Sequence, residues 1–434
     1  MRCEVVLGEA YNELFQYGAA KQHFNRALMC AGRPAPRFAA GMILDVAWQL
    51  AQQLSARAGL MRGRSADPLL PLTSQIHEKL SEIAYFNSGK LSILHATLTS
   101  LNLAERSGSV REAVKGFAAM AIGFAGSDQR WLSELYNRRS LALAEEQGGI
   151  EDIAYANVVS GVYRAADGHW EQAVECLTYS ASLYARLGAT GRWQQSIAGL
   201  CAVALARGQL ANAKEWLDKL GPARRDMPAQ ISAYLHGFDT CLALAQGGPL
   251  QELATRLDKV IGARELAQFD RIFCQGLIAA SYWRLGDRTR AIESARAGLE
   301  NLSAGVPVAW YITAGIAGIA QTLIDASACG LASRRDAQRA CRILALYART
   351  TKAAAPRAAL LAGRLAAARH DSRRALACWR RGLGAARALG AGYDEALLLY
   401  ELGNHSPHGS SERSEFLEQA RVQYERIGAP LLPT

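Results

Sequence analysis

Small residues recur along the chain in pairs that are twelve residues apart, each pair flanked by larger hydrophobic side chains at helical spacing. Five such pairs are present: Gly8 with Ala20, Gly161 with Ala173, Cys201 with Ala213, Ala279 with Ala291, and Gly363 with Ala375. A small residue on each of two antiparallel helices lets the helix axes approach to about 8–10 Å. Each pair therefore predicts a tightly crossed helical hairpin.

The spacing between the pairs sets the length of the repeating unit. Ala173 and Ala213 are 40 residues apart, and Ala213 and Ala291 are 78 apart, which is two units of 39. The opening residues Leu7, Gly8, Tyr11, Ala20, Phe24 and Ala27 resemble the tetratricopeptide repeat, whose minimal unit is about 34 residues. We expect an all-α, tetratricopeptide-like helical solenoid of about ten helix pairs with a period near 40.

A stretch rich in proline and glycine interrupts this pattern early in the chain. Gly59, Gly63, Pro68 and Pro71 lie close together and should break a helix. We divide the chain accordingly into four parts: N-terminal helical repeats at 1–57, a linker loop at 58–75, the main solenoid at 76–403, and a loop with a C-terminal capping helix at 404–434.

Cysteine usage and the N-terminus bear on the cellular compartment. The nine cysteines are scattered singly with no Cys-x-x-Cys, which is typical of core residues in a reducing environment. The first residues include acids where a signal peptide needs an apolar core. The uncharged stretch 306–324 is 19 residues long, near the lower limit for a membrane span, but we interpret it as a helix buried within the array. We expect a cytoplasmic protein that does not cross a membrane.

Motifs that would carry catalysis are incomplete. The pair Gly89-Lys90 lacks the rest of a P-loop, because Ala84 stands where the first glycine belongs and Leu91 follows the lysine. The run 77–81 (His-Glu-Lys-Leu-Ser) begins like a zinc-protease helix but has Ser81 in place of the second histidine. His405 and His408 fall in a Ser/Pro/Gly-rich segment and are interpreted as an exposed turn. We expect no catalytic, cofactor or metal site, and no enzymatic activity in this chain alone.

Positive charge is concentrated in residues 331–390. This segment holds 14 Lys and Arg and only two Asp, a net charge of +12, whereas the whole chain carries +10. One interpretation is a set of solvated helix faces in an Arg-rich composition; the other is a face that binds an acidic partner. The candidate binding residues are Arg373, Arg374, Arg380 and Arg381, because offsets of seven place them in pairs on one side of a helix. Aromatic residues are sparse there, which argues against single-stranded nucleic acid as the partner.

Several segments resemble one family more closely than generic repeats do. They are 82–86, 100–106, 161–163, 168–170, 361–366, 375–383, 400–403 and 424–429. The chain resembles the C-terminal repeat region of bacterial proteins that join an adenylate or guanylate cyclase domain, a P-loop ATPase module and a helical array. The resemblance implies a sensory or coupling region, and the catalytic activities of those proteins do not carry over because their motifs are missing here.

These observations favour a non-catalytic interaction or regulatory module of a bacterial signalling protein. Its inner surface, built from the first helix of each hairpin, or its basic face would hold a partner protein or domain. The tryptophans, Trp170 among them, are expected to pack between repeats. One alternative is a regulatory fragment of a cyclase–ATPase whose catalytic domains lie upstream; another is the sensor domain of a transcription activator.

Overall fold

The computed structural model describes residues 1–36, 38–57, 67–87, 90–125, 129–221, 227–264, 266–303, 307 and 309–430. Within these ranges the regular secondary structure is helical, and no strand occurs. The prediction of an all-α repeat fold is confirmed.

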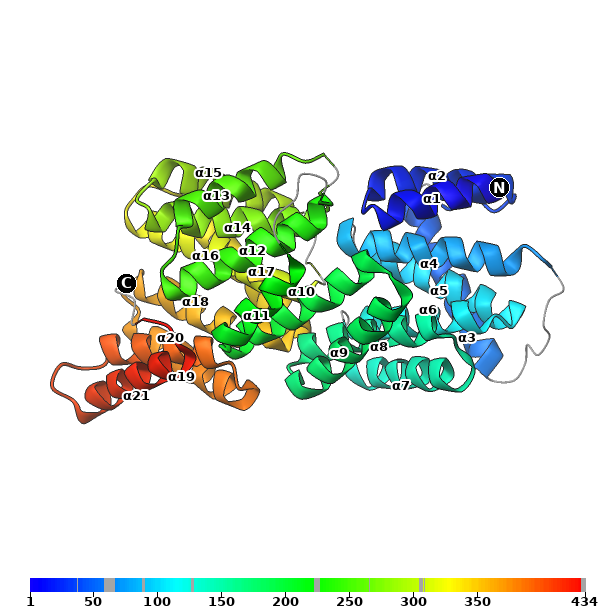
Figure 1. Cartoon of the computed structure of the whole chain (residues 1–434). Helices are drawn as coiled ribbons and strands as arrows, with labels where there is room; N and C mark the ends of the chain where they lie inside the picture. The colour runs from blue at the N-terminus through cyan, green and yellow to red at the C-terminus, as the bar shows by residue number, and fades with distance from the viewer. Residues whose placement is uncertain are drawn as a thin grey trace. The chain divides into compact units, whose positions relative to one another are not determined.

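The chain divides into two compact units, shown in Figure 1. Unit 1 comprises residues 1–163 and 175–196, and unit 2 comprises residues 164–174 and 197–434. The division falls within three helices, α8, α9 and α10. The helices up to this point are α1 (Arg2–Glu13), α2 (Tyr17–Cys30), α3 (Ala39–Arg57), α4 (Leu70–Asn87), α5 (Lys90–Ser107), α6 (Val110–Ala125), α7 (Arg130–Gln147), α8 (Ile150–Asp167), α9 (Trp170–Leu187) and α10 (Thr190–Arg207).

Unit 2 continues with eleven α-helices and two short 3-10 helices in its described residues. They are α11 (Leu210–Leu220), α12 (Ala229–Gln246), α13 (Leu250–Ile261), α14 (Gln268–Arg284), α15 (Arg288–Leu302), η1 (Trp310–Ile312), α16 (Thr313–Ala328), α17 (Arg334–Thr350), η2 (Lys352–Ala354), α18 (Ala355–Ala367), α19 (Ser372–Leu389), α20 (Gly392–His405) and α21 (Ser411–Ile427).

From α4 onward the helices form a series of hairpins, each an even-numbered helix followed by an odd-numbered one. We call the even-numbered helices A-type and the odd-numbered ones B-type. The A-type helices α4 to α14 begin at residues 70, 110, 150, 190, 229 and 268, at intervals of 39 or 40 residues, and α16, α18 and α20 begin at 313, 355 and 392. From α4 to α14 the interval agrees with the period near 40 expected from the sequence, and the later intervals are 45, 42 and 37 residues.

The small residues of the twelve-residue pairs lie where hairpin helices cross. A Cβ on Gly8 would lie 2.6 Å from Cε1 of Phe24, and one on Gly363 would lie 2.2 Å from Nε1 of Trp379. Each of these glycines therefore makes room for an aromatic ring four residues beyond the small residue of the second helix of its hairpin. Cys201 is fully buried, and its Sγ lies 3.4 Å from the carbonyl oxygen of Ala213.

The described part of the uncharged stretch 306–324 is mostly buried protein core. A Cβ on Gly276 of α14 would lie 1.8 Å from the carbonyl oxygen of Gly315 in α16, so these two helices touch backbone to backbone. Apolar residues of α16, such as Ile316 and Ile319, are fully buried against the neighbouring helices. Among the described residues, no helix combines the length and the apolar character needed to cross a membrane.

Two of the predicted domain boundaries are wrong. Helix α4 begins at Leu70, so residues 70–75 are helical and not part of a linker; Pro71 is accommodated because the first turn of a helix has no partners for its N–H groups. Residues 58–66 of the predicted linker lie outside the described residues, and residues 67–69 form a short turn before α4. Gly89 of the incomplete P-loop also lies outside the described residues. At the other end α20 continues to His405, and α21 packs against α20 as an ordinary B-type helix.

Candidate functional site

A cavity of about 1180 Å³ lies within unit 2. Residues of all six A-type helices of this unit, α10, α12, α14, α16, α18 and α20, line it, together with η1 and a few B-type side chains. Figure 1 shows these helices following one another across unit 2. The A-type helices thus provide an inner surface, as the sequence led us to expect, and this surface borders a large open hollow.

The beginning and the end of unit 2 are in contact. Trp170 Nε1 donates a hydrogen bond to the carbonyl oxygen of Leu389, and Lys352 Nζ lies 2.8 Å from Asp167 Oδ1. A Cβ on Gly208, which follows α10, would lie 2.8 Å from the backbone nitrogen of Tyr393 at the start of α20. The expected role of Trp170 in packing between repeats is confirmed, although its neighbour is more than 200 residues away in sequence.

Aromatic side chains from several helices form much of the cavity wall. They are Phe238, Trp283, Trp310, Tyr311, Trp379, Tyr393, Tyr400 and Tyr424. The Arg288 guanidinium lies 3.8 Å from the centre of the Trp283 ring, a cation–π contact. Trp379 is fully buried and donates from Nε1 to the carbonyl oxygen of Leu360 at 3.0 Å. The wall therefore combines large apolar surfaces with fixed hydrogen bonds.

Two arginines of α18 extend into the wall and are paired with acids of α20. Arg357 Nε donates to Asp394 Oδ1 at 2.6 Å, and Arg364 Nε donates to Glu401 Oε1 at 2.5 Å. Burial would lower the pKa of Arg357, but Asp394 holds that pKa above its ordinary value. The arginines are seven residues apart, so both pairs lie on the same side of α18.

The second pair extends into a longer polar chain across three helices. Arg364 also donates to the side-chain oxygen of Gln321 in α16, and Gln321 donates to Asp325 Oδ1 at 2.7 Å. On the α20 side, the His405 ring lies 4.6 Å from the centre of the Trp379 ring and 3.0 Å (Nδ1) from the carbonyl oxygen of Glu401. His405 is therefore the last residue of α20 and not part of a turn; its side chain is exposed, as expected from the sequence, and it lines the cavity.

A buried carboxyl group supports Tyr311 at the cavity wall. Tyr311 donates from its hydroxyl to Asp270 Oδ1 at 2.6 Å, and Asp270 is fully buried at the start of α14. Burial raises the pKa of Asp270 to about 7, while hydrogen bonds from Tyr311 and Gln230 oppose the increase. The charge of this group consequently changes near neutral pH.

One cysteine, Cys241, is among the described residues that line the cavity. Burial raises the pKa of Cys241 to about 12, so little of the thiolate needed for nucleophilic attack is present at neutral pH. What the wall offers is noncovalent contact with aromatic rings and with arginines that are already held in place by acids.

Unit 1 has a different inner side, where charged side chains meet each other. Arg192 of α10 donates to both carboxylate oxygens of Glu82 in α4, at 2.5 and 3.2 Å, and lies 3.5 Å from Glu13 of α1. Asn12 and Lys79 also approach Glu82, at 3.3 and 3.4 Å. Burial alone would raise the pKa of Glu82, but Arg192 and Lys79 hold it well below its ordinary range.

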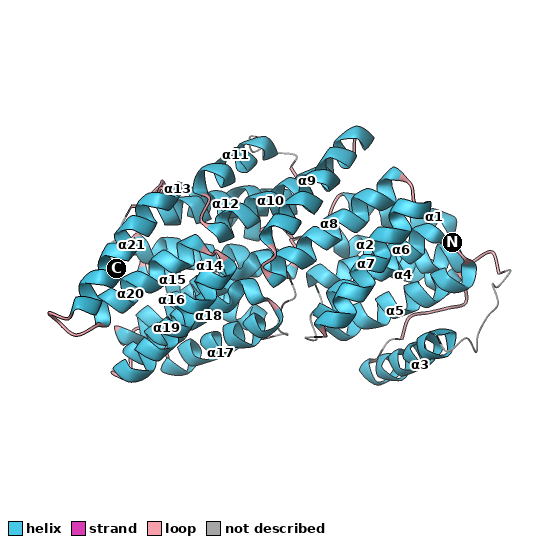
Figure 2. Cartoon of the chain, turned by 90° about the horizontal axis from the view of Figure 1, so that it is seen from below, coloured by secondary structure: helices cyan, strands magenta, loops and turns pink. Residues whose placement is uncertain are grey.

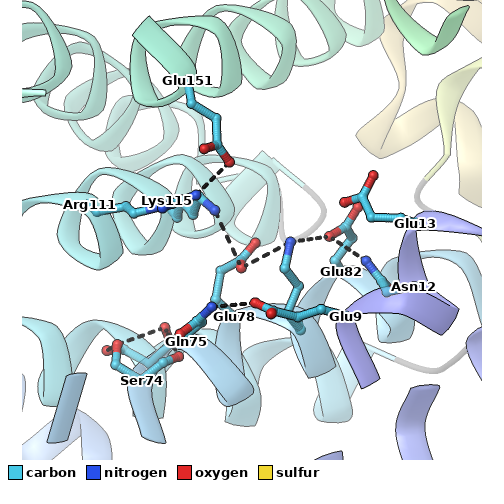
Figure 3. A network of polar contacts seen from close by, with 12 residues as sticks. Glu9, Asn12, Glu13, Ser74, Gln75, Glu78, Glu82, Arg111, Lys115 and Glu151 are labelled. Carbon is cyan, nitrogen blue, oxygen red and sulfur yellow. Dashed lines mark hydrogen bonds and ion pairs between the residues drawn. The ribbon is translucent and has the colours of Figure 1, made fainter. Parts of the chain in front are cut away.

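The network continues into α6 and α8, as Figure 3 shows. The Glu78 side chain is 1% exposed and lies 3.5 Å from Lys79 Nζ and 3.9 Å from Lys115 Nζ. Lys115 also lies over the Tyr155 ring, 5.3 Å from its centre. Burial lowers the pKa of Lys115 although Glu78 opposes this. Charges from α1, α4, α6 and α10, with an aromatic ring from α8, thus fill the inner side of unit 1.

The sequence of α4 carries a signal for this network of buried polar contacts. In α4, polar residues occur at helical spacing on one side: Ser74, His77, Glu78, Ser81 and Glu82. A polar stripe with the spacing of a core face indicates buried polar contacts.

The four predicted basic residues lie on the outer face of α19. Arg373, Arg374, Arg380 and Arg381 are all exposed, and within the described part of the chain three of them make no ion pair. Arg380 Nη2 lies 2.7 Å from Glu412 Oε1 in α21 and is therefore partly neutralised. Other arginines of the basic segment point elsewhere, including Arg357 and Arg364 in the cavity wall.

Comparison with known proteins does not place the chain in a family. No protein-family model matches the sequence, and no curated protein is significantly similar to it.

Proposed function

We propose that the chain is a non-catalytic binding module that holds a segment of a partner protein in the cavity of unit 2. The observation that carries this proposal is the cavity itself: a large volume lined by every A-type helix of the unit and rich in tryptophan, tyrosine and arginine. These three residue types dominate the energetics of protein–protein contacts.

The size of the cavity favours a peptide over a small metabolite. Typical small-molecule sites have volumes of about 300–1,000 Å³, and this cavity exceeds that range. Aromatic rings would receive apolar side chains of the peptide. The paired Arg357 and Arg364 would bond to its backbone carbonyl groups without the cost of burying a lone charge, because Asp394 and Glu401 already neutralise them.

Selection of peptides from a random display library on the purified full chain tests the proposal. The Tyr400→Ala variant removes a ring from the cavity wall, and Tyr179→Ala removes an exposed ring of α9 in unit 1 as a matched control. Selected peptides should bind the Tyr400→Ala variant about tenfold or more weakly, the effect of losing an aromatic anchor, and the control with unchanged affinity. Equal binding to both variants, or failure to select any peptide, would reject the cavity as the binding site.

The outer face of α19 supports a second candidate, the binding of an acidic partner. Arg373, Arg374 and Arg381 are exposed without an ion pair among the described residues. Charge reversal at Arg373 and Arg381 should then abolish capture of poly-glutamate and leave cavity peptides unaffected. Capture that survives the reversal would dismiss this candidate.

The wider role of the module is also a proposal. The resemblance to the repeat region of cyclase–ATPase proteins supports a regulatory or coupling role, in which the bound segment belongs to a signalling protein or to a catalytic domain. Reading the genomic DNA upstream of the codon for Met1 tests this relation, since an in-frame P-loop and cyclase motif would make the chain a regulatory region. A stop codon there would favour a free-standing adaptor.

A further inference from the structure

Helix α3 presents its polar side to the rest of unit 1. Asp45 Oδ2 lies 2.6 Å from His95 Nε2, and Asn102 Nδ2 donates to Gln49 Oε1 at 2.7 Å. Gln53 Nε2 donates to the side chain of Asn102 at 2.5 Å. These partners lie on α5, so α3 is attached to α5 mainly through hydrogen bonds, with Val46 in the adjacent hydrophobic core.

The opposite side of α3 is apolar and exposed to solvent. Figure 2 shows α3 at the edge of unit 1, beyond α5. The exposed fractions of the large side chains are 56% for Ile43, 73% for Leu44, 62% for Trp48, 39% for Leu50 and 71% for Leu54. An amphipathic surface helix normally buries its apolar stripe and solvates its polar one. Helix α3 does the reverse, and the described residues leave its apolar side without a cover.

The spacing on this side fits a partner helix. Ala40, Leu44, Ala47, Ala51 and Leu54 follow one another at intervals of four, three, four and three residues, which is the spacing of a coiled-coil seam. Between residues 39 and 55 Asp45 is the only charged residue, and it faces α5. No charge on the stripe selects an oppositely charged partner or repels an identical stripe.

We propose that this stripe is a homodimer interface, in which α3 of one copy packs antiparallel against α3 of a second copy about a twofold axis at Ala47. The interface is separate from the peptide site proposed in unit 2.

The order of large and small residues makes the stripe self-complementary. An antiparallel pair centred on Ala47 places Leu54 opposite Ala40 and Ile43 opposite Ala51, because residues equidistant from the axis meet, and it brings Leu44 against Leu50 as an apolar contact. Ala47 meets its own copy on the axis, which allows the two backbones to approach closely. A closed, isologous contact requires such a match between a surface and itself.

The exposed area is sufficient for a dimer that dissociates on dilution. The stripe is confined to one helix, with large side chains that are 39% to 73% exposed, so an interface built from it would be smaller than the ~800 Å² per partner of a standard interface. We therefore expect a monomer–dimer equilibrium that sedimentation can follow over a range of concentrations from micromolar upward.

Sedimentation velocity of the full chain and of the Ala47→Arg variant tests the proposal. The wild type should shift from monomer to dimer with concentration, and Ala47→Arg, which sets two like charges on the axis, should weaken the dimer about tenfold or more. The Ala388→Arg variant introduces the same change at an exposed alanine of α19 and should dimerise like wild type. Monomer at all concentrations, or equal dimerisation by all three proteins, overturns the proposal.

Mixing two oppositely charged variants distinguishes the loss of the interface from damage to the fold. Ala47→Arg and Ala47→Glu variants, each monomeric alone, should form a mixed dimer when combined, because opposite charges then meet at the axis. An Ala47→Cys variant in a background with Ser at the exposed cysteines 3, 30 and 329 should form an intermolecular disulfide on oxidation. A dimer that neither recovers on mixing nor cross-links at position 47 would place the contact elsewhere and reject the proposed axis.

Discussion

Units 1 and 2 are built from the same helical hairpin, and in each unit a late segment returns to an early one. In unit 1 Arg192 of α10 reaches Glu13 of α1 and Glu82 of α4, and ion pairs occupy the inner side. In unit 2 the residue after α10, Gly208, packs on the start of α20, and the inner side borders a cavity of about 1180 Å³. The hairpin and its close crossings are therefore compatible with either a filled or a hollow interior.

The side chains on the A-type helices decide between the two outcomes. Unit 1 places acids and bases from different helices within reach of each other, and such pairs must remain together once buried because an unpaired charge is costly. Unit 2 places aromatic rings and small residues there, and its arginines of α18 are neutralised by neighbours in α20. Because the charged side chains of unit 2 pair with neighbours along the wall, the centre of the unit stays free for a ligand.

The largest effect should follow from breaking the ion pairs of unit 1. The Arg192→Met variant keeps most of the side-chain volume but leaves Glu82 without its main partner, and we expect a loss of about 3–5 kcal/mol in the stability of unit 1. Urea-dependent hydrogen exchange of the α4 amides measures it. The control Arg256→Met removes an exposed pair with Glu252 of α13, for which a change below about 1 kcal/mol is expected. Similar small changes in both variants would show that the network of unit 1 does not stabilise it.

A methyl group between α14 and α16 should weaken unit 2 without affecting unit 1. A Cβ on Gly276 would lie 1.8 Å from the carbonyl oxygen of Gly315, so Gly276→Ala must separate two helices that line the cavity. We expect a loss of roughly 1–3 kcal/mol or more from overpacking, read from hydrogen exchange in α14. The matched Gly384→Ala change in α19 meets nothing within 4 Å and should stabilise by about 0.5–1 kcal/mol. A neutral Gly276→Ala variant would contradict the close crossing.

Lowering the pH from 7.5 to 5.5 should change the stability of the two units by smaller amounts and in opposite directions. Burial, with His95 nearby, lowers the pKa of His77 in unit 1 to about 3, so the unfolded chain takes up a proton that the folded unit does not, and unit 1 loses stability below about pH 6.5. Asp270 in unit 2 has a raised pKa of about 7, so the folded unit takes up the proton first and gains stability as the pH falls below 7.

Each change should amount to about 1–2 kcal/mol, at 1.36 kcal/mol for each pKa unit. Unfolding of α4 and α14 followed by hydrogen exchange at the two pH values measures both. The Asp270→Asn variant should abolish the gain in unit 2, because its amide stays neutral while still accepting the hydrogen bond from Tyr311. Parallel pH trends in the two units would be inconsistent with these assignments.

The helical hairpins could be predicted from the sequence, but the contacts on the inner sides of the two units could not. Gly8, Cys201 and Gly363 revealed the close crossings because such contacts are local and recur at a fixed interval. The encounter of Trp170 with Leu389, and of Arg192 with Glu82, joins residues that are 219 and 110 positions apart. These contacts depend on the accumulated rotation of successive hairpins, which the spacing of single residues does not reveal.

The candidate site illustrates the same limit. One interpretation of the basic segment 331–390 was a single acid-binding face, but its arginines divide between the cavity wall and the outer side of α19 because A-type and B-type helices alternate within it. His405 looked like a loop residue beside serine, proline and glycine, but one more helical turn of α20 places its ring on Trp379. The composition shows where the positive charge lies in the sequence, but the alternation of A-type and B-type helices determines which surface each side chain reaches.

Hydrogen exchange of the full chain with a library-selected peptide tests the central claim most directly. The account predicts added protection in the A-type helices α14, α16, α18 and α20 of unit 2, with α4 and α6 of unit 1 unchanged. Protection confined to the outer helices α17 and α19, or to unit 1, would contradict the assignment of the cavity as the binding site.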